Sequence, residues 1–217
     1  MMAERGDRLV VHEPFSHVVD FGVAEVDGRV VHAERELIDA LRELALERPV
    51  FFKDTTDFHY PQLLRDTRFL REAVHTFMIR DPKAAIASHY RLNPNLGRDE
   101  IGFAWLFEIY AAVRGATGID PVVVDGDDLV AAPEALVRAY CVRVGIPYMP
   151  EALQWEPKVL PSWQRTARWH TSVSESSGFE PPRADGAVDV EAHPRLRAYL
   201  GYHRPYYERL HARRLRV

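Results

Sequence analysis

The chain has 217 residues, of which 47% are hydrophobic and 28% are charged, and its formal net charge is −4. This length and composition are typical of one globular domain with a substantial core. The charge gives no general attraction to nucleic acid, no apolar run approaches the roughly 18 residues of a membrane span, and the first residues lack the apolar stretch of a signal peptide. We therefore expect a cytoplasmic protein that binds neither nucleic acid nor a membrane.

Four short apolar runs are predicted to be strands, and helical patterns separate them along the chain. The runs cover residues 9–12, 50–53, 76–79 and 122–125. Alternating strands and helices are typical of a parallel sheet with crossover helices. The predicted fold class is therefore α/β, with a parallel sheet and flanking helices in a single domain over residues 1–217.

Helical periodicity is found in segments between these strands and after the last of them. It predicts helices at residues 32–48, 103–116 and 133–144, the last of which contains the single cysteine, Cys141, on its apolar face. Residues 156–190 are rich in Pro, Ser, Trp and charge, and we expect an irregular, lid-like segment that crosses the sheet edge. A last helix is predicted at residues 193–215.

The segment around residue 80 joins a predicted strand to a predicted helix. The strand ends at Arg80, Asp81 and Pro82, and Ser88 follows about two helical turns later. A guanidinium group can bind two phosphate oxygens at once, and a serine hydroxyl at this spacing can donate to a third. We interpret Arg80 and Ser88 as a phosphate clamp. The alternative is an ordinary strand end followed by a helix that begins with proline.

This segment resembles the 3′-phosphate-binding segment of bacterial sulfotransferases that use 3′-phosphoadenosine 5′-phosphosulfate (PAPS), in which an arginine, usually in Arg-Asp-Pro, precedes a serine at the same spacing. Residues 12–16, 50–54 and 122–155 resemble further segments of that family in the same order. The resemblance implies a P-loop NTPase-like sulfotransferase fold. It also implies transfer of a sulfuryl group from PAPS, as co-substrate, to a hydroxyl or amine of a small-molecule acceptor.

One feature of the family is not found in these residues. PAPS-using enzymes begin with a strand and a loop rich in Gly, Ser, Thr and Arg, which holds the 5′-phosphosulfate at a helix N-terminus. The 217 residues contain no such loop and no Gly-Lys pair. The resemblance thus predicts a fold lacking its first strand, which in the family lies between the strands at 50–53 and 76–79, through a start site drawn too late or through true loss. We expect the chain by itself to bind PAPS poorly, with little or no activity, and an upstream extension to raise both stability and affinity.

Sulfuryl transfer requires a base for the acceptor and positive charge near the transferred group. Glu13, an acidic residue before a proline at a strand end, is the first candidate for the base, and the resemblance implies the same role. His12 is the second candidate, although side-chain alternation along a strand predicts that His12 and Glu13 point in opposite directions. Lys53 ends the next strand and is predicted to converge with Glu13 and to stabilise the sulfuryl oxygens, with Asp54 either orienting Lys53 or helping to position the acceptor. The alternative is that these residues are strand ends without a function.

Other assignments follow from what the chain does not contain. None of its ten histidines forms a His-x-x-x-His pair near a carboxylate, so no metal is expected. Lys158, Arg165 and Arg168 lie where related enzymes close a basic loop over the nucleotide, but they match no motif and remain unassigned. Two alternative functions stay open: a degenerate, non-catalytic domain that binds a nucleotide or a protein, and a fragment of a P-loop-type nucleoside or metabolite kinase, which would need a loop lysine and a Mg²⁺-binding Ser or Thr.

Overall fold

The strands of the computed structural model, which describes residues 1–181 and 188–217, form parallel pairs. β1 (Leu9–His12) pairs with β4 (Val50–Lys53), and β5 (Thr76–Ile79) pairs with β6 (Val122–Asp125). All four predicted strands are confirmed at their predicted bounds. Within the described residues no ladder joins the two pairs, as in a sheet that lacks the strand between residues 50–53 and 76–79. Hydrophobic periodicity predicts strands but does not specify which strands share hydrogen bonds.

An antiparallel hairpin, not predicted from the sequence, follows the first strand. β2 (Ala24–Val26) pairs with β3 (Arg29–Val31) through a turn at Asp27 and Gly28. Both turn residues have positive φ, 53° and 79°, as a two-residue type I′ turn requires. The Asp-Gly pair is a sequence signal for such a hairpin, but three-residue strands are too short to show alternation.

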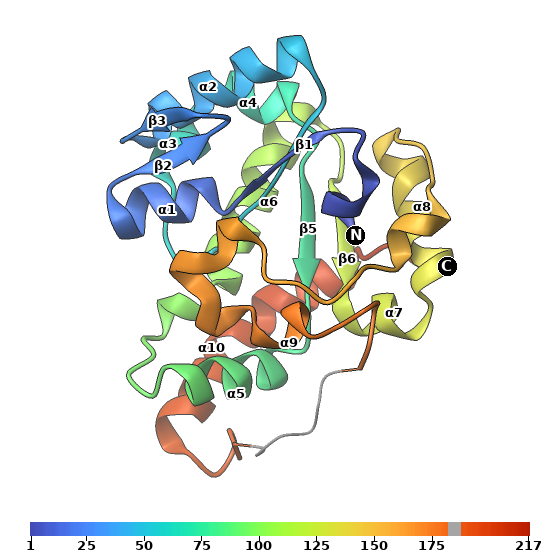
Figure 1. The fold of residues 1–217 in the computed structure, drawn as a ribbon. Coiled ribbons are helices and arrows are strands. Elements are labelled where there is room, and N and C mark those ends of the chain that lie inside the picture. The colour runs from blue at the N-terminus through green and yellow to red at the C-terminus, as the bar shows by residue number, and fades with distance from the viewer. Residues whose placement is uncertain (182–187) are drawn as a thin grey trace.

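Helices surround the strands on several sides (Figure 1). The α-helices are α1 (Pro14–Phe21), α2 (Glu34–Glu47), α3 (Pro61–Arg65), α4 (Thr67–Glu72), α5 (Pro82–Leu92), α6 (Phe103–Thr117), α7 (Gly126–Ala131), α8 (Pro133–Val144), α9 (Thr171–Ser174) and α10 (Pro194–His211). Short 3-10 helices are η1 (Met2–Arg5), η2 (Asp99–Ile101), η3 (Pro150–Leu153) and η4 (Pro161–Trp169). Among the described residues, no helix combines the length and the apolar character needed to cross a bilayer.

Two predictions about the second half of the chain need correction. The last helix ends at His211, not at residue 215, because the chain then turns back to β6, where the Leu215 amide donates to the Val123 carbonyl at 2.7 Å. Residues 161–174 are helical in η4 and α9, not irregular. Residues 182–187 of the predicted lid-like segment lie outside the described part of the chain.

Aspartates at strand ends start two of the helices that follow the β5–β6 pair. Asp81 accepts a hydrogen bond from the Ala84 amide at 2.9 Å and precedes Pro82 at the start of α5. Asp125 accepts one from the Asp127 amide at 2.9 Å at the start of α7. These side chains satisfy amides that the first helical turn leaves free, and they hold each helix directly at the carboxyl end of its strand.

The core fixes the position of these strand ends. Buried apolar side chains from β1, α1, α2, β5, α6 and β6 form one cluster, and β1 contributes Val11 while β5 contributes Phe77 and Ile79. A smaller cluster around Ile86 and Leu196 packs α5 against α10. The carboxyl ends of the strands therefore rest on a packed base, which suits residues that must hold a fixed geometry.

Candidate functional site

Glu13 occupies an unusual backbone position at the end of β1. Its φ and ψ are 48° and 45°, a left-handed conformation that is uncommon for residues other than glycine. Its amide donates to the Lys53 carbonyl at 2.7 Å and so extends the β1–β4 ladder by one bond. Pro14 then begins α1. Conformations of this kind cost on the order of 1–3 kcal/mol and are concentrated at functional sites.

The left-handed turn brings the Glu13 carboxylate to the same side as the His12 ring. Glu13 Oε2 lies 3.4 Å from His12 Nε2, and Glu13 Oε1 accepts a hydrogen bond from Lys53 Nζ. The expected convergence of Glu13 and Lys53 is therefore present. The expectation that His12 and Glu13 point in opposite directions is wrong, because strand alternation ends at His12.

The charges around Glu13 keep its carboxylate ionised. Burial alone would raise the pKa of Glu13, but the hydrogen bond with His12 and the charge of the Lys53 ammonium group together lower it to about 2. The Glu13 side chain is 7% exposed, whereas the Lys53 side chain is 47% exposed. Lys53 therefore reaches both the buried carboxylate and the solvent-accessible space at the strand ends.

The segment formed by η4 and α9 adds aromatic and imidazole groups to this cluster. His170 Nε2 lies 3.2 Å from His12 Nε2 and 3.1 Å from Thr166 Oγ1. The ring of Trp163 stacks on that of His170, with 4.9 Å between centroids. Burial lowers the pKa of His170 to about 4, so its imidazole is neutral at physiological pH. Sequence reasoning missed Thr166, Trp163 and His170, since nothing in the local spacing relates them to β1.

Asp54 does not orient Lys53 but holds the start of α1. It does not pair with Lys53 but accepts hydrogen bonds from the Phe15 amide at 2.6 Å and the Ser16 amide at 3.1 Å. The Ser16 hydroxyl and the Thr55 amide donate to the same carboxylate. Asp54 thereby fixes the first turn of α1 to β4. Burial raises the pKa of Asp54 to about 6, although these donors oppose the shift.

The structure places Arg80 and Ser88 at the carboxyl end of β5 and on α5. Arg80 is exposed, and its Nη2 makes a long hydrogen bond of 3.5 Å to the Ala85 carbonyl. Ser88 is half-buried one turn beyond Ala85 on the same helix. The guanidinium group therefore lies along the first turns of α5, toward the turn that carries Ser88. Their joint role in holding a phosphate stays a prediction.

The segment formed by η4 and α9 contacts both the end of β1 and helix α5. In Figure 1 the orange chain of η4 and α9 lies between α1 and α5. His170 contacts His12 at the end of β1, and the ring of Trp169 packs edge-on against that of His89 on α5, with 4.7 Å between centroids. The end of β1 and the first turns of α5 therefore border a shared region covered by residues 161–174.

The three basic residues left unassigned by sequence have partners in the structure. Lys158 pairs with Glu4 at 2.9 Å. The guanidinium groups of Arg165 and Arg168 lie over the rings of Phe21 and Trp169, at 4.4 Å and 4.8 Å from the centroids. The contact of Arg165 with Phe21 holds the covering segment against α1.

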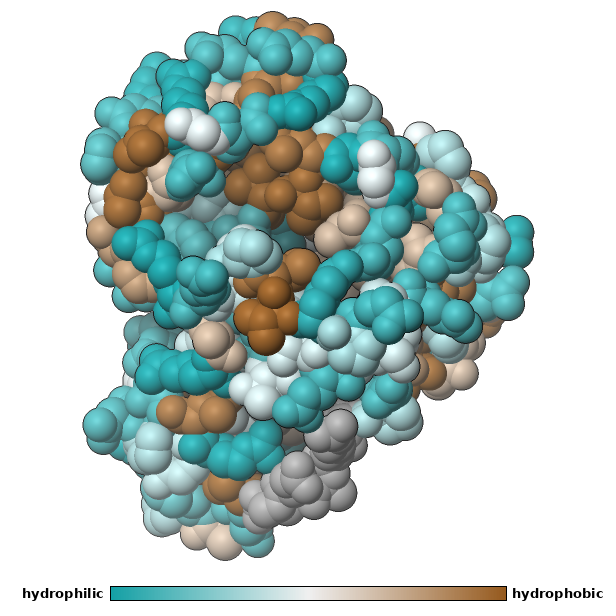
Figure 2. Space-filling model, in the orientation of Figure 1, coloured by the Kyte–Doolittle hydropathy of each residue, from teal (hydrophilic) through white to brown (hydrophobic). Residues whose placement is uncertain are grey.

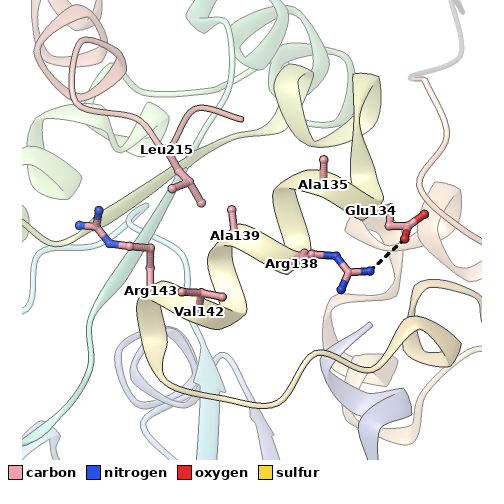
Figure 3. Close-up of a pocket in the computed structure, with 7 residues that line it drawn as sticks. All are labelled: Glu134, Ala135, Arg138, Ala139, Val142, Arg143 and Leu215. Atoms are coloured by element: carbon pink, nitrogen blue, oxygen red, sulfur yellow. Dashed lines mark hydrogen bonds and ion pairs between the residues drawn. The ribbon is translucent and has the colours of Figure 1, made fainter.

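The surface has two further features, an apolar hollow and a groove along α8. Figure 2 shows that apolar surface on this face gathers in a hollow near the middle of the molecule, with mostly hydrophilic surface around it. Figure 3 shows a separate open groove along α8, lined by Ala135, Ala139, Val142 and Leu215 with charged residues at its rim. None of the predicted site residues lines the α8 groove.

A family model described as a sulfotransferase domain matches residues 40–214. The chain belongs to this family. Lys53, Arg80 and Ser88 fall inside the range of the sulfotransferase domain model, as does His170, whereas His12 and Glu13 precede it. The mixed α/β fold with parallel strand pairs and flanking helices is consistent with this family.

Two curated proteins of Arabidopsis thaliana are similar to part of the chain. Branched-chain-amino-acid aminotransferase-like protein 2 is 29% identical over 118 residues, and branched-chain-amino-acid aminotransferase-like protein 1 is 31% identical over 112 residues. The matches cover 54% and 50% of this chain but 21% and 20% of those proteins. The chain thus spans about a fifth of the length of these relatives. No solved structure matches the chain.

Proposed function

We propose that this sulfotransferase domain transfers a sulfuryl group from PAPS to a hydroxyl or amine of a small-molecule acceptor. The observation that carries the proposal is the contact between the Glu13 carboxylate and the Lys53 ammonium group at the carboxyl ends of β1 and β4. Ligands of open α/β folds bind at this edge of the strands. A base and a cation in contact there supply the two charges that sulfuryl transfer requires.

Glu13 accepts the proton that the acceptor loses. The acceptor oxygen or nitrogen attacks the sulfur of PAPS in line with the leaving phosphate oxygen. The new bond to sulfur forms while the sulfur–phosphate oxygen bond breaks, and adenosine 3′,5′-bisphosphate leaves. The proton of the acceptor passes to Glu13 Oε1 or Oε2. The sulfuryl group passes directly to the acceptor and forms no bond with the protein. Positioning and electrostatic stabilisation therefore account for most of the rate enhancement.

Lys53 links the basicity of Glu13 to the presence of the donor. While the ammonium group contacts Glu13, it helps to hold the pKa of that carboxyl at about 2, too low for an efficient base. When Lys53 turns toward the sulfuryl oxygens, Glu13 loses this cation and its pKa rises. The exposed stem of Lys53 leaves room for that movement. Glu13 thereby becomes more basic at the moment when the donor is in place.

Arg80 and Ser88 bind the 3′-phosphate of the nucleotide in this proposal. Arg80 is an exposed residue, and the weak bond of its guanidinium group to the Ala85 carbonyl is easily replaced by charge-assisted bonds to phosphate. Ser88 adds a neutral donor one helical turn from that carbonyl. The 3′-phosphate distinguishes PAPS from ordinary adenine nucleotides, so this pair provides the nucleotide selectivity.

The test is a transfer assay with radiolabelled PAPS and a panel of phenols, alcohols and amines, performed on the natural protein that carries this domain. We expect acceptor-dependent formation of a labelled product together with adenosine 3′,5′-bisphosphate. Selective binding of that bisphosphate without any transfer would contradict the proposal and favour the non-catalytic, nucleotide-binding alternative.

A further inference from the structure

The cluster of His12, Glu13 and His170 joins two distant parts of the chain. His12 and Glu13 stand at the end of β1, and His170 lies 158 residues away from His12, between η4 and α9. Each residue offers one ligand atom, and these atoms all lie within 4.8 Å of one another. Two imidazole nitrogens and one carboxylate oxygen suit a first-row ion such as Zn²⁺ and are a poor set for Mg²⁺.

Two of the three separations within the cluster, both measured from His12 Nε2, are those of ligands in a tetrahedral metal site. His12 Nε2 lies 3.2 Å from His170 Nε2 and 3.4 Å from Glu13 Oε2. Ligands bound to zinc at about 2.0 Å in a tetrahedron stand about 3.3 Å apart. One ion beside His12 Nε2 can therefore contact all three groups after a small rotation of the Glu13 or His170 side chain.

Hydrogen bonds within the cluster leave coordinating atoms available. A neutral imidazole nitrogen either donates one proton or accepts through one lone pair. His170 Nε2 has two polar neighbours, His12 Nε2 and Thr166 Oγ1, and can form a hydrogen bond with only one of them. Glu13 binds Lys53 through Oε1, and its Oε2 faces His12 Nε2 at 3.4 Å, so a metal ion would take the place of the proton between these two atoms.

We propose that His12, Glu13 and His170 bind one Zn²⁺ ion. A water molecule near Thr166 completes the tetrahedron. The ion links η4 and α9 to the end of β1. It also coordinates the Glu13 carboxylate, which the proposed transfer reaction uses as its base. Zinc is therefore an inhibitor of that reaction. The binding site stands on the geometry of the three ligands alone, and only the inhibition rests on the proposed function. The inference replaces the prediction of no metal, which considered histidine spacing along the sequence.

The binding test uses metal-depleted protein titrated with Zn²⁺ in competition with a chromophoric chelator. We expect one site per chain. His12→Ala and His170→Ala should each weaken affinity by at least about 100-fold, at the upper end of effects seen even for indirect ligand partners. Co²⁺ should give the intense visible absorption of a tetrahedral site, and Mg²⁺ should not displace zinc.

A matched control and a second variant keep the test decisive. His59→Ala removes a histidine that pairs with a single carboxylate, Glu108, at 3.1 Å, and it should change zinc affinity by less than about twofold. If circular dichroism shows that His170→Ala does not fold, His170→Gln, which retains most of the side-chain volume, takes its place. Absence of a stoichiometric site, or binding that survives both the His12 and His170 substitutions, would overturn the proposal.

The inhibition is tested separately from the binding. Zinc should abolish transfer over the same concentration range in which it fills the site, and chelation should restore transfer. Transfer that persists with the site full would overturn the inhibitory role. A metal-free protein without transfer activity would count against the proposed function and would leave the zinc-binding result intact.

Discussion

Lys53 donates a hydrogen bond to the carboxylate of Glu13 where the parallel strands β1 and β4 end. The contact depends on the left-handed backbone of Glu13, because a continued strand would turn its side chain to the other face. It also joins a buried acid to a partly exposed cation. A carboxylate and an ammonium group, the two groups that the proposed transfer needs, therefore meet at one strand edge.

Replacing Glu13 with Gln should reduce turnover by about 10²–10⁴-fold, the usual contribution of a general base. The amide retains the shape of the side chain but cannot take up the acceptor proton. Steady-state kinetics would measure the loss, with nucleotide affinity changed by less than about threefold. Glu25→Gln, at an exposed position of β2, is the matched control and should have full activity. Equal turnover in the Glu13 and Glu25 variants would exclude Glu13 as the base.

Replacing Arg80 with Ala should weaken binding of adenosine 3′,5′-bisphosphate by about 10–100-fold, since charge-assisted hydrogen bonds contribute about 1.5–3 kcal/mol. Binding of adenosine 5′-phosphate should hardly change. Ser88→Ala should show the same selectivity with a smaller loss, about 3–10-fold. Calorimetric titration measures all four affinities. Lys83→Ala removes another cation from α5, one that pairs with Glu191 at 3.4 Å, and should leave the preference for the 3′-phosphate intact. An equal loss for both nucleotides in the Arg80 variant would place Arg80 elsewhere than at the 3′-phosphate.

Replacing Asp54 with Ala should lower the free energy of unfolding by about 2–4 kcal/mol, because the amides of Phe15 and Ser16 lose their buried acceptor. Urea denaturation followed by circular dichroism would measure the change. Asp39→Ala removes an exposed carboxylate of α2 and should cost less than about 0.5 kcal/mol. Similar losses in the two variants would show that Asp54 does not anchor α1 to β4.

Asp54 and Asp57 also predict how stability depends on pH. Burial raises the pKa of each to about 6 from a usual value of 3.8. Between about pH 4 and 6 the native state thus binds more protons than the unfolded state, so the free energy of unfolding falls as pH rises through this range. Each group contributes a slope of at most about 1.4 kcal/mol per pH unit. Asp54→Asn should reduce the slope measured by urea denaturation, and an unchanged slope would contradict the raised pKa.

The sequence was sufficient for features that depend on neighbouring residues. Apolar runs such as 50–53 and 76–79 match the strands at both ends, since a polar or proline-containing turn follows each run directly. Arg80 and Ser88 belong to one strand–turn–helix unit for the same reason. Convergence of Glu13 and Lys53 followed from parallel strands that end at one edge.

Features that depend on distant parts of the chain were not predictable in this way. His170 reaches His12 only because residues 161–174 fold over the strand ends, and no periodicity encodes that path. The orientation of Glu13 depends on a single left-handed residue, whereas strand alternation assumes a regular backbone. Asp54 is held by amides on α1, a helix that the sequence pattern did not reveal.

In the proposed reaction Glu13 and Lys53 act together in sulfuryl transfer. The most direct measurement is the rate of transfer from radiolabelled PAPS to its best acceptor, for the natural protein and for Glu13→Gln, Lys53→Met and the double variant. We predict that each single substitution lowers turnover by at least about 100-fold and that the double variant is hardly slower than either, because one step needs both groups. Transfer that withstands both substitutions would show that Glu13 and Lys53 do not act together in the reaction.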